Sequence, residues 1–467
     1  MSTTFRPHQI DDLFLLPPDV RDWLAPGHLA LFISEVVDIL DLKAIMSTYG
    51  KGTGSGMPPY HPAMMVKLLV YGYCTGKTSS RRIERATYDE VPFRVLAANQ
   101  HPDHDSIADF RKRHLTALAD LFLQVLRMAG QMGLVKLGNV AVDGTKIKAN
   151  ASKHKAMSYQ RMVETEARLK QEVEALLARS EQADAAEDAV HGKGNRHEDL
   201  PEELRRRHAR LAKIAQAKAA LEEQAKEMAT LQAEAARQRI AERQEQERAT
   251  GIKPHGKDPQ VPDPQEAKPD PKAQRNFTDP ESRIMLDGAS KGFEQCYNAQ
   301  AAVDGAHQII VAAAVTQNAN DKQELVPMMA MVEQNAGCLP ENTLADSGYF
   351  SEANVTHPDL ADTTLLIPPD RQKHNQQAEL PVHDPAAPQT AADTMRRKLA
   401  TATGKAAYAL RKTIVEPVFG QIKQARGFRR FSLRGLANVA AEWQLVCVAH
   451  NLLKIFRSAR PLQLQVA

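Results

Sequence analysis

The stretch IVEPVFGQIKQARGFRRFSLRGL, residues 414–436, decides how the rest of the chain is interpreted. One acidic residue, Glu416, lies within an apolar run, and Lys423 follows seven residues later. Positions 408, 412, 416 and 423 fall near one face of a helix, because a helix returns to the same face every three to four residues. A carboxylate among cations on such a helix predicts a metal ligand beside a phosphate backbone. The alternative is an exposed glutamate that pairs with neighbouring lysines.

Pro417 disturbs this pattern, because it has no amide hydrogen and disfavours helical geometry at Glu416. We therefore expect the helix to bend at Pro417 or to begin there. Four arginines downstream are predicted to hold phosphates, with an affinity that falls steeply as salt rises. They are Arg426, Arg429, Arg430 and Arg434. The aromatic residues between them, Phe428 and Phe431, are predicted either to stack on unpaired bases or to pack in the core.

The composition bounds the classes of protein that the chain can belong to. Its 467 residues are enough for two to four domains, and a net charge of +3 requires any polyanion to be met by local basic patches. The four cysteines are far apart and form no C-x-x-C pair, which favours a reducing compartment and no zinc site. The N-terminus lacks a signal-peptide pattern, and no apolar run is long enough for a bilayer. We expect a cytoplasmic protein with no membrane partner.

Residues 1–135 are predicted to form an all-helical domain. A short basic helix carries Arg81 and Arg82, and a second basic helix follows the run His101–Asp105. Short helices with basic faces suit DNA binding, although a plain helical bundle gives the same pattern, and this segment alone leaves both interpretations open. The run His101–Asp105 is better explained as a loop with a helix cap than as a set of metal ligands.

The middle of the chain combines one strand with a long insertion. Residues 136–150 are predicted to hold a strand that ends at Asp143. In residues 151–250, apolar residues recur at three-, four- and seven-residue steps on two segments, which predicts a helical coiled-coil hairpin without chemistry of its own. Residues 251–280 are rich in proline, lysine and aspartate and are interpreted as a linker.

Strand signals resume in residues 281–457, and residues 458–467 are taken as a tail. Asp304-Gly305 is expected to turn between two alternating strands, and Asp321 is expected to cap the next helix. The predicted elements, in order, are strands at 295–303 and 308–316, a helix through 325–332, a strand at 342–346, a helix from about 351, a strand at 363–367, a polar stretch at 370–395, the helix carrying Glu416 and a helix at 438–456.

Without the insertion, the order of elements is strand, strand, strand, helix, strand, helix, strand, helix. This is the succession of an α/β fold with a ribonuclease H-like core, preceded by the helical domain. In such a core, acidic residues from the first strand, the end of the fourth strand and the last helix converge. Asp143, Asp346 and Glu416 occupy those places.

Both aspartates have a plainer interpretation. The tetrapeptide AVDG occurs at 141–144 and again at 302–305, and each copy could be a simple turn. The turn is favoured at Asp304, whereas for Asp143 turn and strand remain equally open. Asp346 stands at a strand end, where it could serve as a helix cap or as a functional carboxylate.

The chain resembles bacterial insertion-sequence transposases of the Asp-Asp-Glu (DDE) type. The residues of the family's Tyr-Arg-Glu-Lys-like C-terminal signature are matched by Tyr408, Arg411, Lys412, Glu416 and Lys423, followed by GFRRFSLRGL (427–436) and EWQLVCVAHNLLK (442–454). The settings of the two aspartates are matched by AVDGTKIKAN (141–150) and LADSGYFS (344–351), and the family's helical N-terminal domain by YHPAMMVKLLVYGYCTGKTSSRRIE (60–84) and PDHDSIADFRKRH (102–114).

The resemblance implies a set of site residues. Asp143, Asp346 and Glu416 would be catalytic ligands of two Mg²⁺ ions, for which Mn²⁺ could substitute, and Tyr408 and Lys423 would contact the DNA backbone. The family commonly places arginine four residues before the glutamate. Here Lys412 has that spacing and Arg411 lies one residue further back, so Lys412 is favoured, because an offset of five rotates a side chain about 140° away on a helix.

The resemblance also implies an activity: a DNA transposase that cuts insertion-sequence ends and joins the 3′-hydroxyl to target DNA by metal-dependent phosphoryl transfer. Its partners would be double-stranded DNA, as terminal inverted repeats and target, and a second copy of the chain in a synaptic complex at the bacterial nucleoid. Two alternatives remain open: a non-catalytic sequence-specific DNA-binding protein, and a ribonuclease H-like nuclease without strand transfer.

Overall fold

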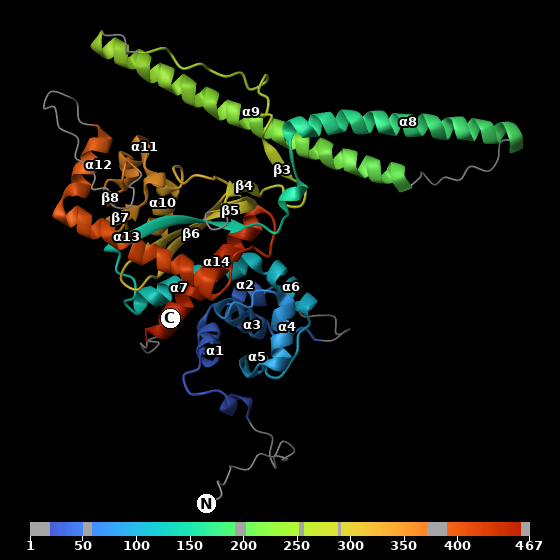
Figure 1. Cartoon of the computed structure of the whole chain (residues 1–467). Helices are drawn as coiled ribbons and strands as arrows, with labels where there is room; N and C mark the ends of the chain where they lie inside the picture. The colour runs from blue at the N-terminus through green and yellow to red at the C-terminus, as the bar shows by residue number, and fades with distance from the viewer. Residues whose placement is uncertain are drawn as a thin grey trace, which may run out of the picture. The chain divides into compact units, whose positions relative to one another are not determined.

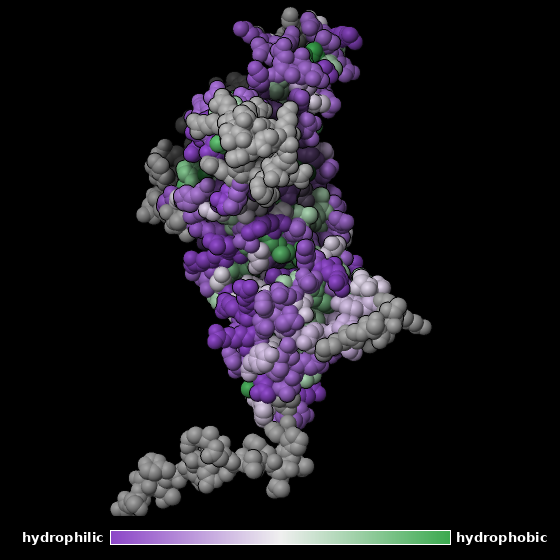
Figure 2. All heavy atoms as spheres, turned by 90° about the vertical axis from the view of Figure 1, so that its right-hand side faces the viewer, coloured by the Kyte–Doolittle hydropathy of each residue, from purple (hydrophilic) through white to green (hydrophobic). Residues whose placement is uncertain are grey.

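The computed structural model describes residues 19–49, 58–191, 202–251, 256–287, 291–370 and 390–458 (Figure 1). The chain divides into two compact units: unit 1 comprises Met1–Ile147 and Asn298–Ala467, and unit 2 comprises Lys148–Tyr297. Within the described ranges no helix is long and apolar enough to cross a membrane. The face drawn in Figure 2 is mostly hydrophilic, with apolar side chains in small separate patches. Most of the predicted polar stretch at 370–395 and nearly all of the tail at 458–467 lie outside the described residues.

The N-terminal part of unit 1 is helical, as predicted. Asp103 caps one of its helices by accepting a hydrogen bond from the amide of Ser106 at 2.8 Å, and His104 pairs with Glu84, so a loop with a cap accounts for the run His101–Asp105. The helices described here are η1 (Val20–Trp23), α1 (Leu29–Ile39), α2 (Lys43–Met46), α3 (Pro62–Cys74), α4 (Ser80–Asp89), α5 (Val91–Leu96), α6 (His104–Arg113) and α7 (Leu115–Gln131).

A mixed sheet forms the centre of the fold, which confirms the predicted α/β class. Its strand order is β4-β5-β1-β7-β8, and β6 also pairs with β5. β1 is parallel to β7 and β7 to β8, whereas β5 is antiparallel to β4 and β6. β1 and β5 continue from unit 1 into unit 2. The strands are β1 (Asn139–Lys148), β4 (Arg283–Leu286), β5 (Phe293–Asp304), β6 (Ile310–Thr316), β7 (Asn342–Ala345) and β8 (Thr364–Leu366).

The last helix of unit 1, α14, packs against β6 and against the N-terminal helices α3 and α7 (Figure 1). The buried carboxylate of Glu442 on α14 accepts hydrogen bonds from Tyr73 Oη at 3.0 Å and from the amide of Ser432 at 2.9 Å. The helices after β6 are α10 (Leu325–Ala336), η3 (Ser347–Tyr349), α11 (Glu352–Val355), η4 (Pro358–Leu360), α12 (Ala391–Ala400), α13 (Ala402–Gly420), the π-helical turn η5 (Gln421–Ala425) and α14 (Leu436–Arg457).

A buried histidine on α14 predicts a loss of stability in acid. His450 lies in the core, with Nε2 2.9 Å from the carbonyl oxygen of Gln308, and burial, aided by Arg426, lowers its pKa from 6.5 to about 3. The unfolded chain therefore binds a proton at His450 more readily than the folded chain does. As the pH falls from 6.5 towards 3, this difference lowers the free energy of unfolding. We expect His450→Gln to remove about 1.4 kcal/mol per pH unit from the slope of unfolding free energy in this window.

Urea denaturation from about pH 7 to about pH 4 measures this slope. His208→Gln, at an exposed position of α9 (Glu202–Thr250), is the matched control and should leave the slope unchanged. Equal slopes for His450→Gln and the unmodified protein would contradict the interpretation.

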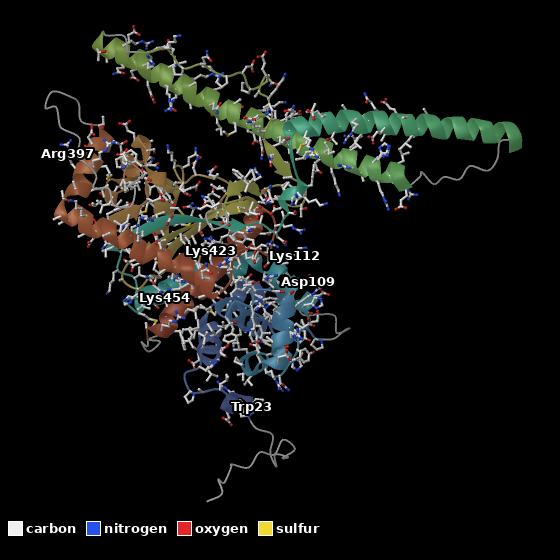
Figure 3. The ribbon with its side chains drawn as sticks, in the orientation of Figure 1. Trp23, Asp109, Lys112, Arg397, Lys423 and Lys454 are labelled. Carbon is white, nitrogen blue, oxygen red and sulfur yellow. The ribbon has the colours of Figure 1, made fainter. Side chains whose placement is uncertain are left out.

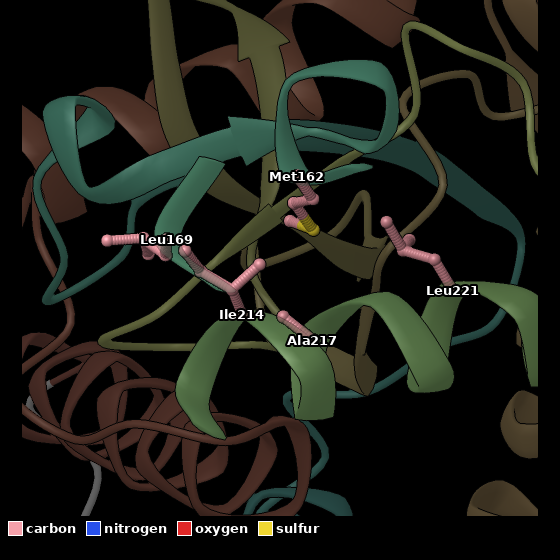
Figure 4. Packing of buried hydrophobic residues seen from close by; sticks show 5 residues of the cluster. All are labelled: Met162, Leu169, Ile214, Ala217 and Leu221. Atoms are coloured by element: carbon pink, nitrogen blue, oxygen red, sulfur yellow. The ribbon is translucent and has the colours of Figure 1, made fainter. Parts of the chain in front are cut away.

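Unit 2 contains two long helices, α8 (Tyr159–His191) and α9, that run antiparallel for part of their length (Figure 1). The contacts descend along α9 as they ascend along α8: Tyr159 bonds to Glu222, Glu166 to Lys218, and Glu172 pairs with Arg207. Between the helices lies an apolar cluster (Figure 4). Its buried members are Met162, Leu169, Ile214, Ala217 and Leu221.

Two features of unit 2 go beyond what the sequence pattern indicates. Met228 and Leu231 continue the apolar pattern of α9 but are 58% and 62% exposed, because they lie beyond the part of α9 that α8 covers. The predicted linker at 251–280 contains a strand, β3 (Gln274–Asn276), which pairs with β2 (Ala156–Ser158). A short 3₁₀ turn, η2 (Lys153–Lys155), precedes β2.

Candidate active site

Asp143 lies within a strand, because β1 continues beyond it to Lys148. It is therefore not in a turn, and the predicted strand end at this residue was wrong. The second AVDG copy does form a turn: the carboxylate of Asp304 accepts hydrogen bonds from the amides of Leu137 at 2.7 Å and Ala306 at 2.9 Å. The tetrapeptide AVDG is thus part of a continuing strand at 141–144 and leads into a turn at 302–305. Strand pairing, and not the local sequence, determines which structure forms.

Asp346 follows β7 directly and is brought beside Asp143 by the parallel register. Val142 pairs with Ala345, so the next residue of each strand is one of the two aspartates. Asp346 also accepts a hydrogen bond from the amide of Gly348 at 2.8 Å and caps η3. The two interpretations of Asp346 are compatible, because one carboxylate oxygen suffices for the cap.

Glu416 lies inside α13, which runs through Pro417 without a break at that residue. Because Pro417 has no amide hydrogen, the carbonyl of Thr413 loses its helical donor. Gln308 replaces it, with Nε2 donating to the Thr413 oxygen at 2.8 Å. The expected helix start at Pro417 was therefore wrong. The side chain of Glu416 is 54% exposed.

Arg411 joins the carboxylates of Asp143 and Glu416. Its Nη1 lies 3.1 Å from Asp143 Oδ2 and its Nη2 3.6 Å from Glu416 Oε1, and its side chain is 10% exposed. Lys412 is exposed. Arg411, and not Lys412, therefore makes the contact with Glu416, whereas the choice of Lys412 as the functional residue stays a prediction. Arg411 lies five residues before Glu416, so the two side chains leave α13 in different directions. The long Arg411 side chain nevertheless extends towards Asp143 on β1, and the Glu416 carboxylate lies within ion-pair distance of it.

Negative charge accumulates around Asp143. Burial raises the pKa of Asp143 to about 7; Arg411 opposes this rise, whereas the carboxylates of Asp346 and Asp321 add to it. The half-buried Tyr408 lies on the same side of α13, and burial raises its pKa as well, with Arg411 opposing. This is a site at which the acidic groups need more positive charge than Arg411 supplies.

Asp321 was missed as a site residue. The helix α10 begins after Glu324, so Asp321 is not its cap, and that expectation was wrong. Its Oδ1 instead accepts hydrogen bonds from Asn298 Nδ2 at 2.6 Å and Gln300 Nε2 at 2.7 Å on β5. These partners are more than twenty residues away in the sequence, and no local pattern marks such a contact.

Mg²⁺ prefers oxygen ligands, and carboxylates are common among them in proteins. The side chains of Asp143, Asp346 and Glu416 are therefore of the right chemical type to bind a hard divalent cation. In the part of the chain that the structure describes, no three acidic, histidine or cysteine side chains stand close enough to hold one as they are. Arg411 explains this, because its guanidinium occupies the space between Asp143 and Glu416.

The predicted DNA-binding residues have different surroundings. Lys423 (Figure 3) donates from Nζ to Thr145 Oγ1 at 3.0 Å and to the Lys146 carbonyl at 3.1 Å, just beyond Asp143 on β1. Arg426 is directed into the protein, with Nη1 3.3 Å from the Val446 carbonyl, and burial lowers its pKa. Its guanidinium is thus turned away from any phosphate at the surface. The predicted arginines with exposed side chains are Arg81, Arg82, Arg429, Arg430 and Arg434.

The two aromatic residues of this segment belong to the core. Phe428 and Phe431 are 4% and 1% exposed, and their rings meet edge to face with centroids 5.5 Å apart. Core packing is therefore confirmed for both, and stacking on bases is not available to them.

Comparison with known protein families gave two matches. Residues 18–113 match the family described as Transposase domain (DUF772), and residues 370–456 match the Transposase DDE domain. The first match covers the N-terminal helices from η1 to α6, and the second covers α12, α13 and nearly all of α14. Neither curated proteins nor solved structures gave a match.

Proposed function

Because the chain belongs to the DDE-type transposases of insertion sequences, we propose that it cuts the ends of its element and joins the freed 3′-hydroxyl to target DNA. The observation that carries the proposal is the register of β1 and β7, in which the Val142–Ala345 pair is followed on each strand by an aspartate. The bridge from Asp143 through Arg411 to Glu416 adds the third acidic residue.

The order of elements supports a ribonuclease H-like core. The sheet strands β1, β4, β5 and β6 come before α10, and β5 is antiparallel to β4 and β6. The strands β7 and β8 then each follow a helix; β7 pairs in parallel with β1, and β8 with β7. The helix α13 then carries Glu416. Apart from β4, which the sequence pattern did not indicate, this order supports the proposed core, and we interpret α8 and α9 as an insertion between β1 and β5.

In this proposal Asp143, Asp346 and Glu416 hold divalent cations through carboxylate oxygens. When bound, such ions activate the attacking oxygen and stabilise the leaving one in an in-line displacement at phosphorus. In the first step water forms the new P–O bond and the 3′-oxygen leaves as a hydroxyl; in the second, that hydroxyl attacks target DNA and releases a target 3′-hydroxyl. Arg411, once released from one carboxylate, is placed to bind a phosphate oxygen.

The DNA is proposed to follow the exposed basic residues of the C-terminal region and of α4, with Tyr408 and Lys423 beside the acidic residues. Each phosphate contact adds to a salt-dependent affinity. Two copies of the chain would hold the two element ends in a synaptic complex on nucleoid DNA, since each end needs its own set of acidic residues.

The purified protein, incubated with Mg²⁺ and DNA that carries the sequences flanking its gene, tests the proposal. We expect nicks at the element ends and, with a pre-cut end, joining to a target plasmid. Binding without nicking would show a DNA-binding protein only, and nicking without joining would show a nuclease.

The helices of unit 2 are expected to be dispensable for nicking, because every proposed catalytic residue lies in unit 1. Residues 174–207 can be replaced by a short glycine-serine linker, which keeps the cluster of Met162, Leu169, Ile214, Ala217 and Leu221. We expect metal-dependent nicking to change by less than about threefold, under 1 kcal/mol in activation free energy. Size-exclusion chromatography of the same variant shows whether assembly depends on the removed segment. A folded variant that cannot nick would place part of α8 or α9 in the active site.

A further inference from the structure

Asp321 is held against β5 by two side-chain amides. Its Oδ1 accepts hydrogen bonds from Asn298 Nδ2 at 2.6 Å and Gln300 Nε2 at 2.7 Å, and Lys146 Nζ lies 3.7 Å from the same oxygen. Two strong donors and a nearby cation hold this carboxyl group in one orientation. The side chain is 19% exposed, as is that of Asp143.

The group of side chains around Asp321 contacts the backbone next to Asp143. A Cβ atom placed on Gly144 would lie 2.6 Å from Asp321 Oδ1 and 2.4 Å from Gln300 Nε2, closer than any side chain could tolerate. Glycine at position 144 thus lets Asp321 and Gln300 pack directly against β1, one residue beyond Asp143. The position of Asp143 in the site therefore depends on this contact.

The same group also contacts the turn that carries Asp346. Gln300 Oε1 accepts a hydrogen bond from Tyr349 Oη. Asn354 Nδ2 donates to the carbonyls of Lys322 at 2.6 Å and Tyr349 at 2.7 Å, which ties the loop of Asp321 to the turn after Asp346. At Gly348, a Cβ atom would lie 2.9 Å from Asp346 Oδ1 and 3.8 Å from Asp321 Oδ2, so the two carboxylates flank this glycine.

A separate observation indicates that one polar atom among the side chains around Asp321 lacks a hydrogen-bond partner. Asn298 is fully buried, and its Oδ1 has no hydrogen-bond partner in the described structure. This oxygen lies 2.9 Å from the Cβ position of Gly144, the residue that follows Asp143. A buried oxygen without a donor is costly unless something positive lies near it. Positive charge at the acidic residues would offset that cost.

We propose that Asp321 is a positioning residue of the cation site: it fixes Asp143 and Asp346 relative to each other, through Gln300 and the two glycines, and adds its negative charge to theirs. This inference rests on the proposed function, because it assigns a role in the same site. In this proposal the positive charge of Lys146 partly offsets the negative charge of Asp321. Removing the charge of Asp321 and removing the charge of Lys146 should therefore change cation affinity in opposite directions.

Binding of Mn²⁺ to the full-length protein without DNA, followed by electron paramagnetic resonance, tests the role of Asp321. Asp321→Asn keeps the shape and can still accept from both amides but removes the charge, and we expect Mn²⁺ affinity to fall about tenfold. Lys146→Met removes the neighbouring cation, and we expect affinity to rise about threefold. A purely structural role for Asp321 would not make Lys146→Met strengthen binding.

The matched control is Asp304→Asn, the same substitution at a buried aspartate whose carboxylate holds backbone amides at a turn. It should leave Mn²⁺ affinity unchanged, and thermal melting checks that each variant is folded. Unchanged affinity in Asp321→Asn, or weaker binding in Lys146→Met, overturns the inference. If Asp143→Asn also fails to weaken Mn²⁺ binding, the proposed cation site itself is wrong, which separates the two failures.

Discussion

Asp143→Asn is expected to lower metal-dependent nicking at least about 1,000-fold, equivalent to about 4 kcal/mol in the activation free energy. The carboxylate of Asp143 lies at the centre of the proposed site. Arg411 pairs with it, and the register of β1 and β7 places Asp346 on the neighbouring strand beside it. Asparagine has the shape of the protonated acid but binds a divalent cation poorly. Gel-based nicking of end-containing DNA in Mg²⁺ measures the loss.

The fold should survive this substitution. Asparagine has nearly the same size as aspartate, and burial, which raises the pKa of Asp143 to about 7, favours an uncharged side chain at this position. Binding of end DNA in a mobility-shift assay without divalent cations is the control, and we expect it to be retained. Asp346→Asn and Glu416→Gln should behave in the same way. Full nicking by any one of these folded variants would remove that residue from the site.

Arg411→Ala is expected to lower nicking about 100-fold, whereas Lys412→Ala should lower it less than about threefold. Both substitutions remove one positive charge from neighbouring positions of α13, so their difference isolates the role of Arg411. Arg411 is 10% exposed and spans Asp143 and Glu416, and its loss leaves two acidic groups without a counter-charge. Lys412 is exposed and contributes at most one phosphate contact.

Single-turnover nicking with saturating DNA separates this effect from weaker DNA binding. Thermal melting of Arg411→Ala with and without Mg²⁺ checks that the variant is folded, and a cation should restore part of any lost stability. A larger defect in Lys412→Ala than in Arg411→Ala would support the choice made from helical spacing alone.

The elements that carry Asp143, Asp346 and Glu416 could be predicted from the sequence. Alternating apolar residues predict strands, and an apolar helix pattern surrounds Glu416. The order of those elements then placed the three acidic residues in corresponding positions of one fold. What the order could not give is the register, because the Val142–Ala345 pairing depends on contacts across two hundred residues.

The choice between Arg411 and Lys412 shows where local spacing fails. Helical rotation describes one helix by itself, whereas the direction of the Arg411 side chain depends on Asp143, a residue of β1. Asp321 was misjudged for the same reason: an aspartate before a helix suggests a cap, but its partners Asn298 and Gln300 lie on a strand. Long-range polar contacts leave no periodic trace in a sequence.

The length of α9 has a geometric consequence. Its 49 residues, at 1.5 Å each, make a rod of roughly 70 Å, as long as about twenty base pairs of duplex DNA. No single neighbour of ordinary size can cover both ends, and α8 accompanies only one half. The other half has contacts of its own: Ala229, Ala233 and Ala236 are buried, and Arg243 Nη2 donates to the carbonyl of Gly256 at 2.8 Å. An insertion or deletion in this half would therefore shift a packed face of α9, and only whole helical turns would keep that face in place.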